Sequence, residues 1–514
     1  MRCFIILVLV GSLLSGCASV TGNQPEPTKT SRAILTITPE NDMHVLPMTD
    51  RPNILFIVAD DLDLELDTIN YMPHLQELLI SQGLTLGDYF VSNPLCCPAR
   101  ATLLRGQFTH NHGVYRNDQP NGGFDAFYSL GRESSTLATW LQAAGYRTVL
   151  LGKYLNGYPF PEDRAYVPVG WDEWYSAAKG SPFAGFRYTL NENGNLVEYK
   201  ETGQGGSQYM TDVLGRKAGD FIQRAGAGHV PFFVYLSTYA PHVPVKPATR
   251  HENLFPDLKA PQTASFNEDD VADKPDGIRF DPPLNDEEIT MVNEEFRARV
   301  LAMQAVDEMI ANLMDVLEET NQLDNTYVIF TSDNGYHLGQ HRLRSGKGTP
   351  YEEDIHVPFI VRGPGIEAGE ILTGYITGNV DFAQTIAELA GVTPPDYVDG
   401  RSLVNLFHAD TRPSISDWRS GYLLEFYGYN RQDEDPNAPP PVAEYLGLRT
   451  QAYLYVEYSN GFIELYDLNN DPYEMVNIAT TADQALLNQL SEWLKELAKC
   501  SGGQCRVLDK EPDR

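Results

Sequence analysis

Four short apolar runs constrain the fold of this chain more than any other feature. They lie at residues 54–59, 148–151, 232–236 and 327–331. None of them alternates polar with apolar residues, so each suits a strand that is buried on both faces of a sheet. Amphipathic helical patterns lie between the runs, at 135–146 and 296–319. Strands that alternate with helices predict an α/β fold, a large sheet flanked by helices.

Polar side chains follow each of the four runs. In chain order they are Asp60 and Asp61, Lys153, His242, and Asp333 with Asn334. Because ligands of open α/β sheets bind beyond the carboxyl ends of the strands, we expect these groups to form one site. Three carboxylates and an amide would suit a hard cation, Ca²⁺ or Mg²⁺, better than zinc. The alternative is that Asp60 and Asp61 form a solvated turn or a helix cap.

The pattern changes from residue 413 onward. Four short strand patterns follow one another without a long helix, at 421–427, 444–450, 452–458 and 463–468, and a helical pattern covers 485–499. This succession predicts a small antiparallel sheet with a C-terminal helix. We therefore expect a catalytic domain at 50–412 and an α+β subdomain at 413–514.

The N-terminus has the composition of an export signal. Arg2 precedes an apolar stretch at 4–14 that is too short to span a bilayer, and Leu14-Ser15-Gly16-Cys17 resembles a bacterial lipobox. We expect residues 1–17 to be a lipoprotein signal peptide with Cys17 as the lipidated residue, and 18–49 to be a flexible tether. An ordinary cleaved signal is the alternative. The prediction is an exported lipoprotein anchored to a membrane, periplasmic or at the cell surface.

Charge and cysteine content limit the partners and the compartment. The formal net charge of −32, from 38 basic and 70 acidic residues, repels nucleic acid. Cys500 and Cys505, separated by a short flexible loop, are expected to form a disulfide after export. Cys96 and Cys97 are adjacent, and a disulfide between neighbours needs strained geometry. At least one of these two is therefore expected to serve a chemical purpose.

The segment around the adjacent cysteines carries a specific motif, Cys96-x-Pro98-x-Arg100. It resembles the signal by which type I sulfatases have a cysteine oxidised to formylglycine. The segments "PNILFIVADD", "LLGKYLNGY", "FTSDNGYHLGQH" and "ELYDLNNDPYEMVN" also resemble sulfatase segments in the family's order, from about 52 to 475. Within the family, "GKYLN", "YTLNENG" and the terminal cysteine pair look most like the glucosamine-6-sulfatase branch. The resemblance implies an alkaline-phosphatase-like fold with a large mixed sheet.

The resemblance also implies roles for individual residues. Cys96 would become 3-oxoalanine (formylglycine) through a maturation enzyme, and Cys97 would fill the variable position. The implied divalent cation, Ca²⁺ more than Mg²⁺, would be held by Asp60, Asp61, Asp333, Asn334 and the modified Cys96. Arg100 would orient the formylglycine, and Lys153 and Lys347 would bind sulfate oxygens. Either His242 or Lys347 would protonate the leaving alcohol of a sulfated carbohydrate or aryl sulfate.

The chain departs from the family's pattern at two positions. Ala99 replaces a frequent serine in the modification signal, and Leu155 stands where many sulfatases have a histidine two residues after the lysine. His112 is the candidate to replace that histidine, and the alternative is that His112 is a structural hydrogen-bonding residue. His356 is expected to be structural, and His110 structural or exposed. His337 and His341 are expected to pack their loop, with a place in the lining of the pocket as the alternative.

Two other functions remain as alternatives. One is a phosphonate or phosphodiester hydrolase that also uses formylglycine. The other is a lipoprotein that binds sulfated glycans without catalysis on a degenerate sulfatase fold. Competent residues at the motif positions other than Leu155 favour a sulfuric ester hydrolase.

Overall fold

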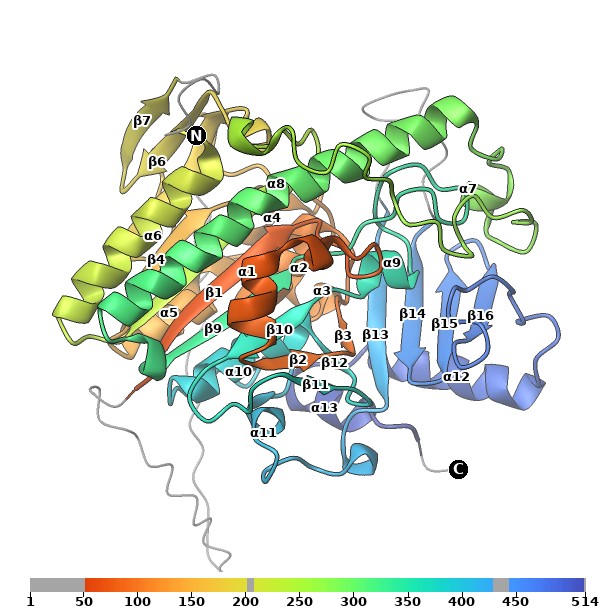
Figure 1. Ribbon diagram of the computed structural model, residues 1–514. Helices are drawn as coiled ribbons and strands as arrows, with labels where there is room; N and C mark the ends of the chain where they lie inside the picture. The colour runs from red at the N-terminus through yellow and green to blue at the C-terminus, as the bar shows by residue number, and fades with distance from the viewer. Residues whose placement is uncertain (1–50, 201–207, 429–442, 513–514) are drawn as a thin grey trace, which may run out of the picture. The chain divides into compact units, whose positions relative to one another are not determined.

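A ten-stranded mixed sheet forms the centre of the fold (Figure 1). The computed structural model describes residues 51–200, 208–428 and 443–512. The predicted signal peptide, the lipidated Cys17 and the tether lie outside the described residues and stay predictions. The domain boundary at 412 lies within the described residues and also stays a prediction. Among the described residues, no helix has both the length and the apolar character needed to cross a membrane.

The strand order of the large sheet is β11-β2-β10-β9-β1-β8-β4-β5-β6-β7. The bounds are β1 Asn53–Asp60, β2 Leu84–Leu86, β4 Arg147–Gly152, β5 Glu173–Gly180, β6 Tyr188–Glu192, β7 Asn195–Tyr199, β8 Phe232–Pro241, β9 Thr326–Ser332, β10 Phe359–Arg362 and β11 Glu370–Leu372. Two short strands, β3 (Tyr89–Phe90) and β12 (Thr377–Gly378), pair with each other outside this sheet.

The four apolar runs of the sequence form the four neighbouring strands β9, β1, β8 and β4, and these strands are parallel. Every residue of β1, β8 and β9 is buried, as expected for strands covered on both faces. The outer pairs β9–β10, β5–β6 and β6–β7 are antiparallel, which makes the sheet mixed. The predicted fold class is therefore confirmed, and the four carboxyl ends meet at one edge.

Helices cover both faces of the sheet. Their bounds are α1 Pro73–Leu75, α2 Cys96–Arg105, α3 Thr109–His112, α4 Gly123–Ser129, α5 Leu137–Ala143, α6 Met210–Ala227, α7 Asp276–Arg279, α8 Asp286–Glu319, α9 Glu352–Ile355, α10 Phe382–Leu389, α11 Val404–Phe407, α12 Gln484–Leu497 and α13 Cys505–Leu508. Alternate side chains of β1 enter two different cores. Ile54 and Phe56 pack in the core that includes α2, α5 and α10, whereas Leu55 and Ile57 pack in the core of α1, α6 and α8.

Helix α8 begins ten residues before the position that the apolar pattern predicts. Asn285 caps it by accepting hydrogen bonds from the backbone N–H groups of Glu287 and Glu288, and Glu288 accepts one from Asn285 N–H in return. Acidic residues in this first turn suit the positive end of the helix dipole. The extra turns were missed because their residues are mostly polar and carry little apolar periodicity.

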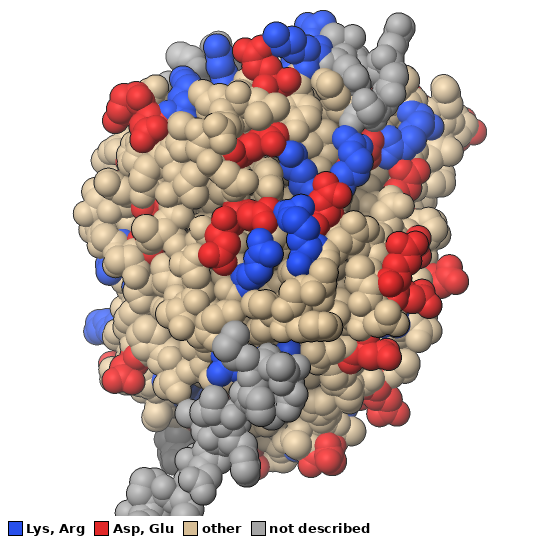
Figure 2. Space-filling view, turned by 90° about the vertical axis from the view of Figure 1, so that its left-hand side faces the viewer, with Lys and Arg blue, Asp and Glu red and all other residues tan. Residues whose placement is uncertain are grey.

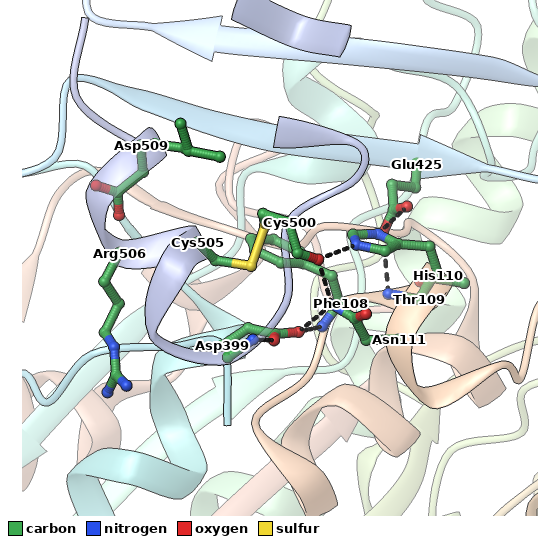
Figure 3. Close-up of a disulfide and its surroundings, with 12 residues drawn as sticks. Phe108, Thr109, His110, Asn111, Asp399, Glu425, Cys500, Cys505, Arg506 and Asp509 are labelled. Carbon is green, nitrogen blue, oxygen red and sulfur yellow. Dashed lines mark hydrogen bonds and ion pairs between the residues drawn. A yellow bond between two sulfur atoms is a disulfide. The ribbon is translucent and has the colours of Figure 1, made fainter. Parts of the chain in front are cut away.

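The C-terminal segment forms the predicted antiparallel sheet, with β13 Gly421–Phe426, β14 Tyr445–Thr450, β15 Tyr453–Tyr458 and β16 Ile463–Asp467 in sequential order. The predicted disulfide Cys500–Cys505 is present (Figure 3). The carbonyl of Cys500 accepts hydrogen bonds from His110 Nε2 at 2.8 Å and Asn111 Nδ2 at 2.9 Å. Asp399 bridges Phe108 N–H and Gly502 N–H. The disulfide loop is thus attached to the segment that follows α2.

Stability is expected to depend on the charge of His110. Both of its ring nitrogens face acceptors, Glu425 Oε1 at 2.7 Å and Cys500 O, so the ring is doubly protonated. Burial opposes that charge, but the bond to Glu425 outweighs burial and raises the pKa of His110 to about 9. The unfolded value is near 6.5. The stabilisation is therefore complete below about pH 6.5 and is lost as the pH rises through about 9.

We expect His110→Gln to remove up to about 3 kcal/mol of unfolding free energy at pH 6 and much less at pH 10. Chemical denaturation at the two pH values measures the difference. His408→Gln is the control, because the ring of His408 lies at the surface and its Nδ1 is hydrogen-bonded to the carbonyl of Gly365 rather than to a carboxylate. Equal pH dependence in His110→Gln and the wild type would show that the imidazolium does not stabilise the fold.

Candidate active site

The residues that follow the four parallel strands meet at the carboxyl edge of the sheet. Asp60 ends β1, and Asp61 takes a left-handed backbone conformation with φ of 65°. Asp61 N–H donates to Asp333 Oδ1 at 3.0 Å, and Asn334 Nδ2 donates to Asp61 Oδ1 at 2.8 Å. These four residues are buried. The exits of β1 and β9 therefore form a single cluster of oxygen atoms, as the sequence predicts.

Three cations are paired with the three carboxylates of this cluster. Lys153 Nζ lies 2.7 and 2.8 Å from the two oxygens of Asp60. Arg100 Nε donates to Asp333 Oδ2 at 2.8 Å. Lys347 Nζ donates to Asp61 Oδ1. In the unmodified chain the positive and negative charges of these six side chains balance.

Cys96 occupies the first residue of α2 and is fully buried. Its Sγ lies 2.7 Å from Lys347 Nζ and 3.7 Å from Asp61 Oδ1. The first residue of a ten-residue helix lies at the positive end of the helix dipole, which favours an anion there. Cys97 is also buried, but its side chain packs in the hydrophobic core with α2 and α5. The structure thus brings Cys96, and not Cys97, to the polar cluster.

The third strand contributes His242. Its Nε2 lies 3.6 Å from Asp61 Oδ2, and its Nδ1 is hydrogen-bonded to Val243 O. About a fifth of the side chain is exposed, so His242 lies at the opening of the cluster, whereas Cys96 is buried. The ring of Phe183 stacks against His242 with the centroids 4.5 Å apart.

The oxygen atoms of the cluster fit a divalent cation. Asp61 Oδ2 and Asn334 Oδ1 are buried and have no hydrogen-bond partner. Ligand atoms of Asp60, Asp61, Cys96 and His242 lie within 4.8 Å of one another. Buried carboxylate oxygens without a donor are costly unless a positive charge meets them. The orphaned atoms therefore support the divalent cation that the sequence predicts, and the predominance of oxygen favours a hard one.

Burial and charge shift the ionisation of these groups in different directions. Burial alone would raise the pKa of Asp60, but Lys153, His242 and Arg100 outweigh it and hold that pKa well below its usual range. Burial raises the pKa of Asp333 to about 6 although Arg100 lowers it. Burial also raises the pKa of the Cys96 thiol to about 12, against the effect of Lys153 and Lys347. The unmodified Cys96 is therefore a neutral thiol at pH 7, which is a weak nucleophile.

His112 is not brought to the cluster. Its Nδ1 accepts from Val114 N–H at 3.0 Å, and its Nε2 lies 3.2 Å from Thr102 Oγ1. Thr102 lies six residues beyond Cys96 on α2, about 9 Å along the helix axis. The structure therefore corrects the interpretation of His112 as a replacement for the missing histidine, and it places His112 as the structural hydrogen-bonding residue of the alternative. Leu155 is buried in the hydrophobic core.

Two residues of the cluster were missed by sequence reasoning. Ser237, in β8, accepts a hydrogen bond from Arg100 Nη1 at 2.5 Å. Arg299, in α8, donates through Nη2 to Asp61 O at 2.5 Å and to Asp63 Oδ1 at 3.0 Å. It is completely buried and stacks over the ring of Tyr336. The sequence contains one sign of this role of Arg299. It lies between apolar positions of an amphipathic helix, where a charged side chain is buried and therefore needs a partner of opposite charge.

Replacing Arg299 by methionine is expected to destabilise the protein by about 3–5 kcal/mol, because the carboxylate of Asp63 and the carbonyl of Asp61 lose their buried donor. The midpoint of chemical denaturation measures the loss. Arg224→Met is the control, since Arg224 is half-exposed and its pair with Glu173 should contribute at most about 1 kcal/mol. Equal losses in the two variants would contradict the assigned role of Arg299.

A groove separate from the polar cluster lies between α6 and α8. This groove of about 750 Å³ is lined by Arg216, Lys217, Arg250, Asp212 and neighbouring residues. Lys217 pairs with Glu192 at 2.8 Å, and Arg250 pairs with Asp212 and Glu308. Figure 2, which views the side where α6 lies, shows Lys and Arg interspersed with Asp and Glu. The groove thus has paired charges, and none of the predicted site residues lines it.

Comparisons with known proteins identify the relatives of this chain. The sulfatase family model matches residues 52–392, and a model described as "N-sulphoglucosamine sulphohydrolase, C-terminal" matches 339–500. Human N-acetylglucosamine-6-sulfatase is 33% identical over 486 residues, which cover 89% of this chain and 86% of that protein. A Caenorhabditis elegans homolog of the extracellular sulfatase Sulf-1 is 37% identical over 384 residues, 73% of this chain. The chain spans about half the length of that relative.

Solved structures show the same fold. One, described as a complex with its substrate D-glucosamine-2-N,6-O-disulfate, has a TM-score of 0.71 and 24% identity, and the match covers 90% of this chain and all of that one. A phosphonate monoester hydrolase from Silicibacter pomeroyi has a TM-score of 0.65 and 21% identity, over 87% and 94% of the two chains. The alkaline-phosphatase-like architecture expected from the sequence is confirmed, and at this identity the likeness concerns the fold alone.

Family membership follows from these matches together with the geometry. The sulfatase model covers most of the chain, and the human relative aligns with nearly all of it. The motif residues of that family meet in one buried cluster. The chain therefore belongs to the sulfatase family, and the predicted class of enzyme, a sulfuric ester hydrolase, is confirmed at the level of that family.

Proposed function

We propose that the protein hydrolyses 6-O-sulfate esters of glucosamine residues in sulfated carbohydrates. The observation that carries this proposal is the convergence of Cys96, three cations and four oxygen ligands at the carboxyl edge of the sheet. The substrate class is inferred from the N-acetylglucosamine-6-sulfatase relatives, which align along nearly the whole chain.

We further propose that Cys96 is converted to formylglycine and that Asp60, Asp61, Asp333 and Asn334 hold Ca²⁺. The formylglycine hydrate would supply the attacking hydroxyl, and the cation would increase its acidity and offset charge on the sulfate. Four oxygen-bearing side chains, together with a Cys96 whose sulfur is lost on conversion, favour Ca²⁺ over zinc. The burial of Cys96 excludes bulk water from the reacting centre.

The chain's own cations are arranged to bind the sulfate. Lys153 and Lys347 reach the cluster from β4 and from the loop after β9, and both are held by carboxylates at fixed positions. Arg100 lies behind them, bonded to Asp333 and Ser237, and it fixes the first turn of α2 against the sheet. Preorganised cations stabilise the charge that develops on sulfate oxygens without reorganising during the reaction.

We propose His242 as the general acid. In an in-line displacement the nucleophile and the leaving oxygen lie on opposite sides of sulfur. Lys347 Nζ is 2.7 Å from Cys96 Sγ and therefore lies on the side of the nucleophile. His242 lies at the opening of the cluster. Because its Nδ1 donates to Val243 O, Nε2 carries a proton only in the imidazolium form, and that form would give the Nε2 proton to the departing ester oxygen. These positions support His242 over Lys347, the two candidates that the sequence left open.

A shallow hollow beside His242 is suited to a sugar ring. It has a volume of about 370 Å³ and is lined by Tyr158, Phe183, Pro182, Pro244 and neighbouring residues. Phe183 also stacks on His242, so the hollow adjoins the proposed leaving-group side. Aromatic faces bind the apolar faces of sugar rings, whereas the sulfate would enter the polar cluster.

A panel of sulfated monosaccharides tests the proposal. We expect kcat/KM for N-acetylglucosamine 6-sulfate to exceed that for 4-O-, 3-O- and 2-N-sulfated analogues by about 100-fold or more. An equal rate on a galactose 6-sulfate would contradict the glucosamine preference. Faster turnover of an aryl phosphonate monoester than of all sulfates would support the alternative function instead.

A further inference from the structure

A second cluster of potential metal ligands lies among residues that the catalytic proposal does not use. His341, Glu353 and Glu474 have side-chain atoms that all lie within 4.8 Å of one another. They are 0%, 5% and 1% exposed. His341 belongs to the loop after β9, Glu353 to α9, and Glu474 to the segment after β16. Three segments separated in the sequence therefore meet in one buried cluster.

Each of the three side chains has one atom without a partner. These atoms are His341 Nε2, Glu353 Oε2 and Glu474 Oε1, and all three are buried. The opposite atom of each side chain is bonded. His341 Nδ1 lies 2.7 Å from Glu268 Oε2, Glu353 Oε1 accepts from Ser265 Oγ at 3.2 Å, and Glu474 Oε2 accepts from Glu352 N–H at 3.3 Å. The side chains are thus fixed from outside the cluster.

The bond to Glu268 determines which face of His341 meets the two carboxyl groups. Burial raises the pKa of Glu268 to about 7, and Lys274 Nζ, which is also buried and lies 3.7 Å from Glu268 Oε1, limits that rise. A carboxylate at Nδ1 makes that nitrogen the donor and leaves a lone pair on Nε2. The ring of Tyr351 packs on His341, with the centroids 4.4 Å apart. Among the described residues, three neighbouring buried side chains therefore each have a polar atom without a hydrogen-bond partner.

We propose that His341, Glu353 and Glu474 bind a divalent cation, with Zn²⁺ as the best fit, at a site separate from the catalytic one. An imidazole nitrogen with two carboxylate oxygens is a ligand set that zinc accepts and that calcium rarely uses. Ligands about 2.1 Å from a tetrahedral zinc are about 3.4 Å apart, so the three ligand atoms would move toward one another by up to about 1.4 Å on binding. The Glu268–His341 pair has the carboxylate–histidine arrangement that orients metal-binding imidazoles.

The proposed site is structural rather than catalytic. Its ligands connect the loop after β9, which also carries Lys347, with the C-terminal sheet. Ser265, Glu268 and Lys274, which support the cluster, come from the Pro-rich stretch 251–290. A cation here would link the loop after β9, helix α9 and the segment after β16, which carry His341, Glu353 and Glu474. His341 would then be a ligand, beyond the packing role that its sequence context suggests.

The competing occupant is a proton. Burial raises the pKa of Glu353 to about 8 and that of Glu474 well above its usual range, whereas burial and Lys274 lower the pKa of His341 to about 3. Without a cation, the two glutamates would therefore hold protons at neutral pH. A metal measurement distinguishes the two cases, because protonated carboxyl groups do not retain zinc.

The test uses the full chain at about pH 8, where Glu268 with its pKa of about 7 is ionised. Calcium in excess occupies the proposed catalytic site, zinc is added, and unbound metal is removed. We expect about one equivalent of zinc per chain by elemental analysis. Glu474→Gln and His341→Gln should each lose that zinc.

The matched control is Glu464→Gln. Glu464 is equally buried, but its oxygens accept from Tyr351, Tyr458 and Tyr466, so it has no orphaned atom. This variant should lose stability and keep the zinc.

Anomalous diffraction at the zinc edge from wild-type crystals adds a test that does not depend on the folding of variants. A peak bounded by His341 Nε2, Glu353 Oε2 and Glu474 Oε1 would establish the site. The absence of that peak, or zinc binding that Glu474→Gln leaves unchanged, would overturn the proposal.

Discussion

Replacing Cys96 by alanine is expected to lower kcat/KM for a sulfate ester by about 10⁴-fold or more, to the level of the uncatalysed background. The reason is geometric. Cys96 Sγ is the group that the structure places against both Lys347 and Asp61 at the N-terminus of α2. The variant should still fold, because alanine at the first residue of a helix creates only a small cavity.

Cys97→Ala is the matched control for this variant. Cys97 is equally buried and adjacent in sequence, but its side chain packs in the hydrophobic core. We expect Cys97→Ala to keep kcat/KM within about tenfold of the wild type and to cost about 1 kcal/mol of stability. Mass spectrometry of the peptide that contains both residues should find the aldehyde at Cys96 in the wild type. Intact thiols at both positions in an active enzyme would contradict the proposed nucleophile.

Removal of the divalent cation is expected to abolish activity, and added Ca²⁺ is expected to restore it. Asp61→Asn should lower kcat by about 10³-fold even with Ca²⁺ present, because the substitution removes a buried ligand charge without changing the shape of the side chain. Asp61 Oδ2 is one of the two orphaned oxygens of the cluster and is therefore free of hydrogen-bond donors that would compete with the cation. Activity after chelation, dialysis and stepwise addition of Ca²⁺ or Mg²⁺ measures the requirement.

Asp307→Asn is the control for the loss of a buried carboxylate. Asp307 lies in α8, is 2% exposed, and accepts hydrogen bonds from the backbone N–H groups of His74 and Leu75. This variant should be less stable and still require Ca²⁺ in the same way. Full activity of the chelated wild-type enzyme would exclude the proposed cation, and restoration by Mg²⁺ but not by Ca²⁺ would change its identity.

The motif residues could be found from sequence because each follows a strand with an unmistakable pattern. Asp60, Lys153, His242 and Asp333 stand directly after or a few residues beyond fully apolar runs, and parallel strands bring their carboxyl ends to one edge. Cys96 could be distinguished from Cys97 because only one frame fits the Cys-x-Pro-x-Arg signal. His112 was not placed correctly from sequence, because its ring lies against Thr102, six residues beyond Cys96 on α2.

Other contacts follow from no local pattern. Arg299 lies on a helix whose apolar spacing gives no indication of Asp61, which is more than two hundred positions away. Glu474 and His341 belong to segments whose sequences each suggest an ordinary loop, yet their side chains lie close together and each has a buried atom without a partner. The pair of Glu474 and His341 depends on how the C-terminal segment packs against the catalytic part. The energy of that packing comes from a shared hydrophobic core.

The sequence by itself determined the family, the α/β class, the strands of the central sheet and most residues of the catalytic cluster. It did so because apolar periodicity and strand exits are local properties, and because the modification signal lies within five consecutive residues. Only the tertiary structure decided which cation lies beside Cys96, which histidine is at the opening, and which acceptors are left without donors. These depend on distances between atoms far apart in the chain, and folding sets those distances by burying side chains in common cores.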